Sequence, residues 1–166
     1  MMSIHHSPLE KIYLKPGELV VTQEPVMVTT VLGSCVSVTM YHSGTRTASI
    51  CHGMLPSGGV SDSFKYVDTS IHCMIKFFKK LKIAREEIEV KLFGGADMFS
   101  GGGPSVSNLT VGRQNIITAT RCLEEYGLAI AASDVGGKSG RKLIFKTDSG
   151  IVFIKKMSGQ AQIPIV

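Results

Sequence analysis

The sequence predicts an α/β fold, a single-domain layered α/β sandwich with a mostly β N-terminal half and two main helices. Its 166 residues, 43% hydrophobic and 19% charged, suit one globular domain over residues 1–166. The first half consists of short segments rich in Val and Thr, with turn signals between them. Two later segments repeat apolar residues with a helical period, and no internal repeat is present.

Four segments of the first half have strand character. Gly17–Thr22 and Pro25–Leu32 are rich in residues that favour strands, and apolar residues alternate with polar ones over Val36–His42. After the turn signal Ser43-Gly44, the segment Thr45–Met54 is the next predicted strand. We expect the last two strands to form an antiparallel hairpin closed by Ser43-Gly44.

Two segments have the periodicity of amphipathic helices. Lys65–Leu81 places four apolar residues on one stripe, namely Val67, Ile71, Ile75 and Phe78. Gly112–Tyr126 does the same and ends at a glycine, and its stripe is Ile116, Ala119 and Leu123. Further strands are expected at Ile88–Phe93, Leu128–Ala132, Lys142–Lys146 and Ile151–Lys155, the last two as a hairpin. The glycine-rich stretch Ser100–Asn108 is expected to be a loop.

The net charge of +5 is spread along the chain and does not indicate nucleic-acid binding. A loose basic cluster from Lys76 to Arg85 alternates with apolar residues and runs into acidic ones, which is typical of a solvated helix face. No apolar run approaches the roughly 18 residues of a membrane-spanning helix, and the N-terminus lacks the pattern of a signal peptide. We therefore expect a cytoplasmic protein without membrane insertion.

The cysteines show no CxxC spacing, so we expect four free thiols, mostly buried and inert: Cys35, Cys51, Cys73 and Cys122. A metal site built from Cys51-His52 and His72-Cys73 is disfavoured, because neighbouring residues on a strand point to opposite faces.

Cys35 is the best candidate for a nucleophile because of its position. The β-rich run Thr29–Leu32 breaks at Gly33, which presents Ser34 and Cys35 at the end of a strand. Small residues there let a substrate carbonyl approach backbone N–H groups that stabilise an oxyanion. A cysteine in a β-rich run is nevertheless usually a core residue, and that alternative stays open on the sequence alone.

His52 is the candidate base because of the predicted hairpin. With the turn at Ser43-Gly44, His42 pairs with Thr45, and extending this ladder places Cys35 directly opposite His52. Opposed residues share a face, with Cβ atoms about 4.5–5.5 Å apart. An imidazolium lowers the pKa of a neighbouring thiol, and a third group, such as a threonine hydroxyl, orients the ring. A hydrogen-bonded core histidine is the other interpretation of His52.

Five blocks resemble, in the right order, the CheD family of chemoreceptor glutamine deamidases. They are Leu32–Val36, His52–Pro56, Tyr66–Asp68, Lys91–Met98 and Asp134–Phe145. The likeness covers roughly residues 17–155, and the ordered blocks together make it specific. One departure is visible at Gln114, where the family usually has the arginine of a Gly-x-Arg-Asn pattern.

The resemblance implies a compact α/β fold similar to bacterial glutamine-deamidating toxins, and a Cys–His–Thr site. The nucleophile then falls on Cys35, the base on His52 and the orienting threonine on Thr29, with its neighbour Thr30 left open. Backbone N–H groups around Ser34 and Cys35 would stabilise the oxyanion, and Gly33 and Ser34 would position the substrate. No metal or organic cofactor is implied.

The implied activity is conversion of receptor glutamine side chains to glutamate, with release of ammonia through a cysteine thioester. The implied partners are the cytoplasmic domains of chemotaxis receptors and a CheC-type phosphatase. A non-catalytic binding partner of that phosphatase and of receptors is therefore the alternative function. A thiol protease would use the same chemistry with a different leaving group.

Overall fold

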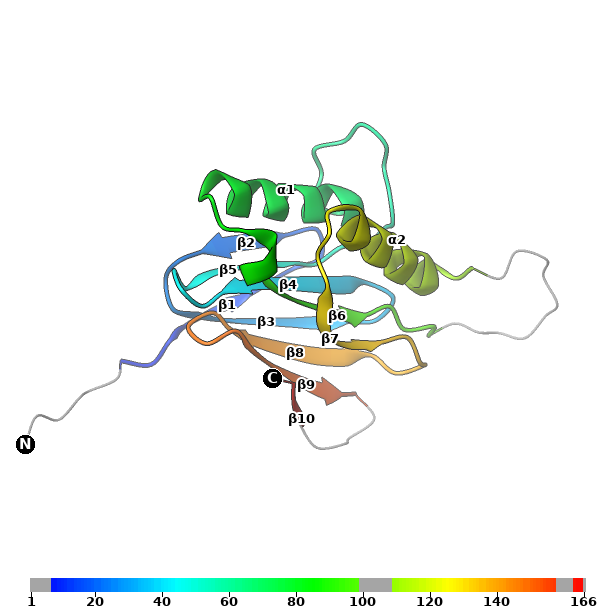
Figure 1. The fold of residues 1–166 in the computed structure, drawn as a ribbon. Coiled ribbons are helices and arrows are strands. Elements are labelled where there is room, and N and C mark those ends of the chain that lie inside the picture. Colours follow the sequence, from blue (N-terminus) through cyan, green and yellow to red (C-terminus); the bar gives the residue numbers. More distant parts are fainter. Residues whose placement is uncertain (1–6, 99–108, 158–162, 166) are drawn as a thin grey trace, which may run out of the picture.

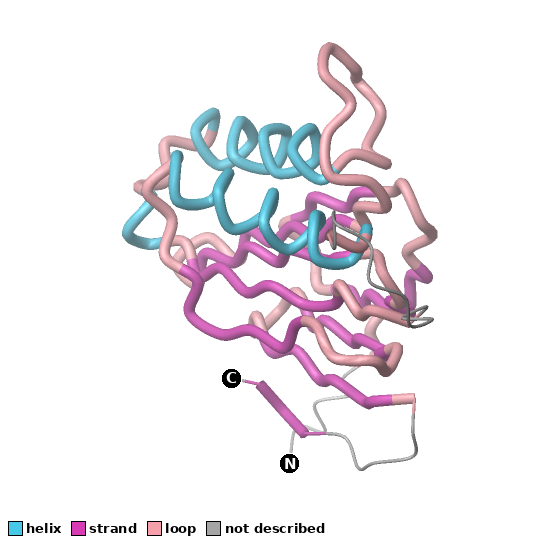
Figure 2. Tube along the Cα trace, turned by 90° about the vertical axis from the view of Figure 1, so that its right-hand side faces the viewer, coloured by secondary structure: helices cyan, strands magenta, loops and turns pink. Residues whose placement is uncertain are grey.

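Two five-stranded sheets and two helices form three layers in the computed structural model (Figure 1). The structure describes residues 7–98, 109–157 and 163–165, so the predicted loop Ser100–Asn108 lies outside the described residues. Helices α1 (Val67–Lys80) and α2 (Val111–Glu125) lie together on one side of the strands (Figure 2). The predicted α/β class with a mostly β N-terminal half is confirmed.

The sheets have different strand orders, and most neighbouring strands are antiparallel. Sheet A has the order β1-β3-β8-β9-β10, with strands Glu10–Tyr13, Val26–Leu32, Arg141–Lys146, Ile151–Lys156 and Ile163–Ile165. Sheet B has the order β2-β5-β4-β6-β7, with strands Leu19–Thr22, Thr47–Cys51, Val36–His42, Glu89–Gly94 and Ile130–Val135. The pairs β1–β3 and β6–β7 are parallel.

The sequence patterns did not predict β1, β10 or the short 3-10 helix η1 (Arg85–Glu87). Strand β1 lies at the edge of sheet A and exposes most of its residues, so it has no apolar alternation to reveal it. Its hydrogen bonds to β3 hold it in place instead.

Sheet B is buried on both faces because it lies between the helices and sheet A. The core on its helix side contains the predicted stripe of α1, namely Val67, Ile71, Ile75 and Phe78, which is confirmed. The core between the sheets joins side chains of both, among them Val28, Leu143, Ile50 and Phe93. Successive residues of β4, β5 and β6 therefore face different cores.

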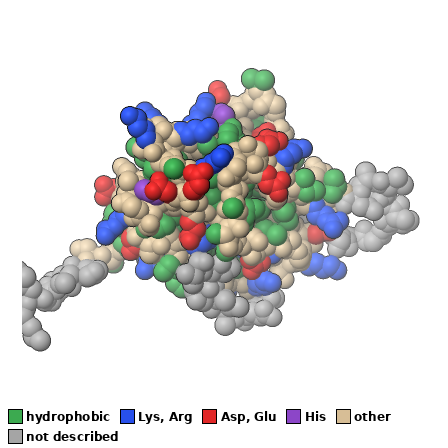
Figure 3. Space-filling model, viewed as in Figure 1, with side chains coloured by type: hydrophobic (Ala, Val, Ile, Leu, Met, Phe, Trp, Pro, Cys, Tyr) green, Lys and Arg blue, Asp and Glu red, His purple; other side chains and the backbone are tan. Residues whose placement is uncertain are grey.

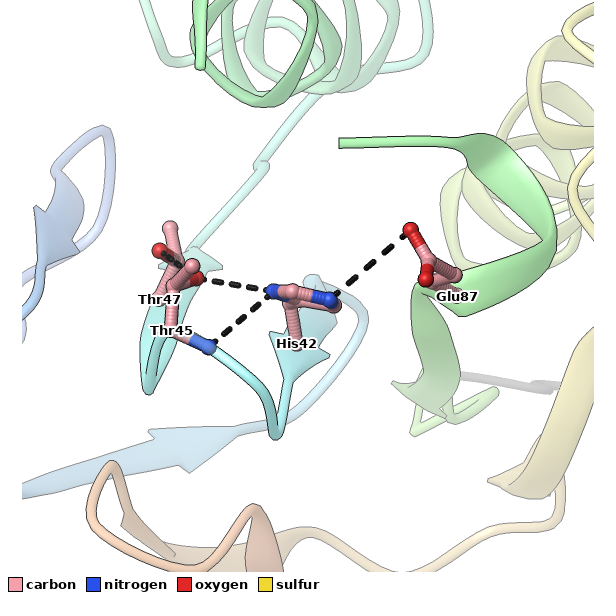
Figure 4. A network of polar contacts seen from close by, with 4 residues as sticks. All are labelled: His42, Thr45, Thr47 and Glu87. Atoms are coloured by element: carbon pink, nitrogen blue, oxygen red, sulfur yellow. Dashed lines mark hydrogen bonds and ion pairs between the residues drawn. The ribbon is translucent and has the colours of Figure 1, made fainter. Parts of the chain in front are cut away.

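The turn between β4 and β5 differs from the predicted one and changes the hairpin register. Four residues, Ser43–Arg46, connect the strands, and His42 pairs with Thr47. The His42 ring organises this turn (Figure 4), since its Nδ1 lies 2.8 Å from Thr45 Oγ1 and its Nε2 3.9 Å from Glu87 Oε2. The predicted pairing of His42 with Thr45 is therefore wrong, because Thr45 lies in the turn and the register is shifted by two residues. A shift of two leaves each side chain on its predicted face.

Charges of both signs are mixed on the molecular face shown in Figure 3, without a single basic stripe across it. Among the described helices, neither is both long and apolar enough to cross a membrane.

Gly94, at the end of β6, lets two backbones approach closely. Its φ is +100°, and a Cβ added there would lie 2.3 Å from the carbonyl oxygen of Cys35. The residue pairs with Val36 in the β4–β6 ladder. A side chain at Gly94 would therefore displace the segment that carries Cys35.

We expect Gly94→Ala to lower the free energy of unfolding more than Gly136→Ala does. Gly136 also has a left-handed backbone (φ +76°), but a Cβ added there would meet no atom within 4 Å. Both variants incur the left-handed penalty of about 1–2 kcal/mol, whereas Gly94→Ala also forces the Cys35 carbonyl to move. Urea unfolding measures both losses, and equal losses would contradict the close approach.

Candidate active site

Three separate segments converge at one end of the sandwich around the loop Gly33–Cys35. The Gly33 carbonyl accepts a hydrogen bond from Ala96 N–H, and the Cys35 carbonyl accepts one from Gly95 N–H, both at 2.9 Å. The N–H of Asp97 in turn donates to the carbonyl of Gly137 at 2.7 Å. Blocks that lie far apart in the sequence are thus neighbours in space.

Arg141 braces this end of the molecule from sheet A. Its side chain is 2% exposed, and Nε donates to Asp134 Oδ1 at 2.9 Å while Nη2 donates to the Gly136 carbonyl at 2.7 Å. In the β3–β8 ladder, Arg141 pairs with Leu32, the residue before the loop Gly33–Cys35. The β7–β8 connection is thereby tied to the end of β3.

Cys35 and His52 lie on the same face of sheet B as diagonal neighbours. Val36 and Gly53 exchange both backbone hydrogen bonds at 2.9 Å, so the opposed pair is Val36–Gly53. The predicted direct opposition of Cys35 and His52 is therefore wrong. Both side chains still face sheet A, because each is one residue from this pair and side chains alternate. Diagonal neighbours are about 7–8 Å apart, within reach of long or aromatic side chains.

The side chain of His52 is held by a threonine of sheet A. Its Nδ1 lies 2.7 Å from Thr30 Oγ1, and this hydroxyl donates to the Leu14 carbonyl at 2.7 Å. A hydroxyl has one proton to donate, so Thr30 Oγ1 must accept from Nδ1–H of His52. The hydrogen bonds therefore assign the proton to Nδ1 and leave Nε2 free to act as a base.

Thr29 does not make this contact. Alternate residues of β3 are buried, and Thr30 belongs to the inward-facing set while Thr29 belongs to the outward-facing one. The expected contact of Thr29 with His52 is thus corrected to Thr30, the neighbour that the sequence left open. The physical reason is that a step of one residue along a strand reverses the face.

Burial sets the protonation of both reactive groups. His52 is 2% exposed, and burial lowers the pKa of its imidazole, opposed in part by the Leu14 backbone and the charge of Glu18. Burial also raises the pKa of the half-buried Cys35 thiol, opposed in part by its own backbone N–H. Burial therefore favours the uncharged thiol and the uncharged imidazole.

The predicted oxyanion donors have free hydrogen-bonding capacity within the described ranges. Among the described residues, the backbone N–H groups of Ser34 and Cys35 donate to no backbone carbonyl. The Cys35 N–H lies close to its own thiol. Gly33 and Ser34 are half-buried, so the loop lies near the surface. Both N–H groups are adjacent to the candidate nucleophile and can donate to a substrate oxygen.

All four cysteines are free, as predicted, but one is fully buried and three are half-buried. Cys51, the neighbour of His52, packs in the core on the helix side of sheet B, where burial raises the pKa of its thiol to about 11. A groove of about 520 Å³ between α1 and α2 is lined in part by Cys122 and His72. Neither Cys35 nor His52 lines that groove.

Comparisons with known proteins agree on one family. The family model described as CheD chemotactic sensory transduction matches residues 54–156. The chain is 47% identical over 157 residues to a probable chemoreceptor glutamine deamidase CheD 2 of Geobacter sulfurreducens, covering 95% of this chain and 96% of that protein. It is 34% identical over 152 residues to a chemoreceptor glutamine deamidase CheD of Thermotoga maritima, covering 90% of this chain and 94% of that protein.

We expect His52 to make the stability of the protein fall on acidification. Because burial lowers the folded-state pKa of His52, the unfolded chain takes up the proton first. This contribution is complete above the ordinary pKa of 6.5 and is lost as the pH falls from there through the lowered value. The limiting slope for one proton is about 1.4 kcal/mol per pH unit.

Urea unfolding of the wild type and of His52→Gln, from about pH 8 to about pH 5, measures this slope. The wild type should lose stability more steeply than His52→Gln. Parallel curves for the wild type and His52→Gln would contradict the expectation.

Proposed function

The chain belongs to the CheD family, and we propose that it is a cytoplasmic protein-glutamine deamidase acting on the cytoplasmic domains of chemotaxis receptors. The observation that carries the proposal is the hydrogen bond between Thr30 and Nδ1 of His52. It leaves Nε2 of the ring free, on the same face of sheet B as Cys35. The substrate class is taken from similar proteins, which are named chemoreceptor glutamine deamidases.

In the first half-reaction, Nε2 of His52 takes the thiol proton of Cys35 while the sulfur attacks the carboxamide carbon. The new C–S bond pushes the carbonyl electron pair onto oxygen, and the N–H groups of Ser34 and Cys35 stabilise this oxyanion. When the oxyanion collapses, the C–N bond breaks and protonated His52 gives its proton to the leaving nitrogen. Ammonia leaves, and a thioester on Cys35 remains.

In the second half-reaction, His52 removes a proton from water as the water oxygen attacks the thioester. The C–S bond breaks, the sulfur of Cys35 recovers its proton from His52, and the substrate side chain is now glutamate. Glutamine and water give glutamate and ammonium, because the released ammonia takes up the proton of the new carboxyl group. The reaction therefore balances without a metal or an organic cofactor. His52 is neutral at the start of each half-reaction, and its lowered pKa favours that state.

Cys35→Ala should abolish ammonia release from a chemoreceptor cytoplasmic fragment, because it removes the nucleophile. Cys73→Ala and Cys122→Ala, which alter half-buried thiols elsewhere, are the matched controls and should keep substantial activity. Mass spectrometry of the fragment checks that glutamine became glutamate at the same rate. A wild-type protein that binds the fragment without releasing ammonia would contradict the proposal and favour the non-catalytic binding partner.

Thr30→Val should lower kcat by about 10- to 100-fold, while Thr29→Val should change it by less than about threefold. The Thr30 variant keeps the side-chain shape but removes the hydroxyl that contacts both Nδ1 of His52 and the Leu14 carbonyl. Thr30→Ser retains the hydroxyl and should recover much of the activity. Steady-state ammonia release measures all three, and a larger loss in Thr29→Val than in Thr30→Val would assign the orienting role to Thr29.

A further inference from the structure

Asn115, in the second turn of α2, joins the two segments that carry the proposed catalytic pair. Its side chain is fully buried, and its Nδ2 donates to the carbonyls of both Ser34 and Met54 at 3.0 Å. Ser34 immediately precedes Cys35, and Met54 is two residues after His52. One amide group thus bridges the nucleophile loop and the strand end that bears the base.

The bond to Ser34 fixes the direction of the next N–H group. In a trans peptide, the carbonyl of one residue and the N–H of the following residue point in opposite directions. The peptide bonds of the described residues are trans. When Asn115 holds the Ser34 carbonyl, it therefore turns the N–H of Cys35 away from α2. This N–H is one of the two proposed oxyanion donors.

Each of the three carbonyls of the loop Gly33–Cys35 accepts a hydrogen bond. The backbone N–H groups of Ala96 and Gly95 bind the first and the third, and the Asn115 side chain binds the middle one. The Ser34 carbonyl is therefore held by a side chain, whereas the carbonyls of Gly33 and Cys35 are held by backbone N–H groups. A substitution can remove that support without touching the others.

Close backbone contact holds Asn115 at this depth. A Cβ added to Gly112 would lie 2.5 Å from the Ala96 carbonyl oxygen, so the first turn of α2 rests directly on the segment that binds the loop. The other end of the amide makes no such bond. Oδ1 of Asn115 is buried and meets no partner among the described residues.

We propose that Asn115 is a positioning residue that orients the Cys35 N–H toward the oxyanion, an inference that rests on the proposed deamidase function. The Nδ2 donor of the amide makes both hydrogen bonds. Asn115→Leu and Asn115→Asp introduce residues of similar size that cannot donate, so both variants lose these bonds.

The test compares kcat and KM for ammonia release from a chemoreceptor cytoplasmic fragment with the rate at which iodoacetamide alkylates Cys35. Alkylation needs the thiol and His52 but forms no oxyanion. We expect Asn115→Leu and Asn115→Asp to lower kcat by about 10- to 100-fold, with KM and the pH profile of alkylation close to wild type. Thr118→Val, at a buried position of the same helix, is the matched control and should leave every value unchanged.

The outcomes separate the two proposals. Wild-type kcat in the folded Asn115 variants overturns this inference alone. A parallel fall of kcat, alkylation and melting temperature, or failure of both variants to fold, shows that Asn115 merely supports the fold and also overturns it. Absence of ammonia release by the wild type overturns the deamidase proposal and this inference with it.

Discussion

The hydrogen bond between Thr30 and His52 spans the core between the two sheets, and the candidate site depends on it. Thr30 lies in sheet A, and His52 follows β5 of sheet B. The Thr30 hydroxyl donates its own hydrogen bond to the carbonyl of Leu14, which follows β1. The backbone of His52 is held as well, since its N–H donates to the Glu18 carbonyl at 3.0 Å. Ring position, ring orientation and tautomer thus all follow from ordinary sheet packing.

The depth of this site favours uncharged side chains, because burial favours the uncharged form of both Cys35 and His52. In the proposed mechanism, charge separation therefore arises when a substrate carbonyl is available to receive the attack. A neutral imidazole is suited to take the proton at that moment. A substrate that also covers the half-buried loop would exclude water and strengthen the donors of the oxyanion.

The carbonyls of the loop Gly33–Cys35 are all hydrogen-bonded, whereas the N–H groups of Ser34 and Cys35 donate to no backbone carbonyl among the described residues. Backbone groups after β6 and the amide of Asn115 bind its carbonyls, while Arg141 braces the end of β3. The N–H groups of Ser34 and Cys35, which bind no backbone carbonyl among the described residues, are the proposed oxyanion donors. An oxyanion site needs such preorganised donors, because donors that must first reorient contribute less to lowering the barrier.

The strand alternation and the apolar stripe of α1 could be predicted from the sequence alone, because both follow from local periodicity. Short motifs also made Cys35 and His52 the candidate reactive pair. The sequence also placed both residues on one face of the sheet. The predicted register was wrong by two residues, and a shift of two leaves every side chain on the same face. The tertiary structure decided the partner of His52. Thr29 and Thr30 are equivalent as letters, and what separates them is the sheet that packs against β3. It also revealed β1, whose exposed residues carry no pattern. The two hydrogen bonds of Asn115 likewise come from tertiary packing, because the carbonyls that accept them are distant in sequence and meet where α2 packs on the end of sheet B.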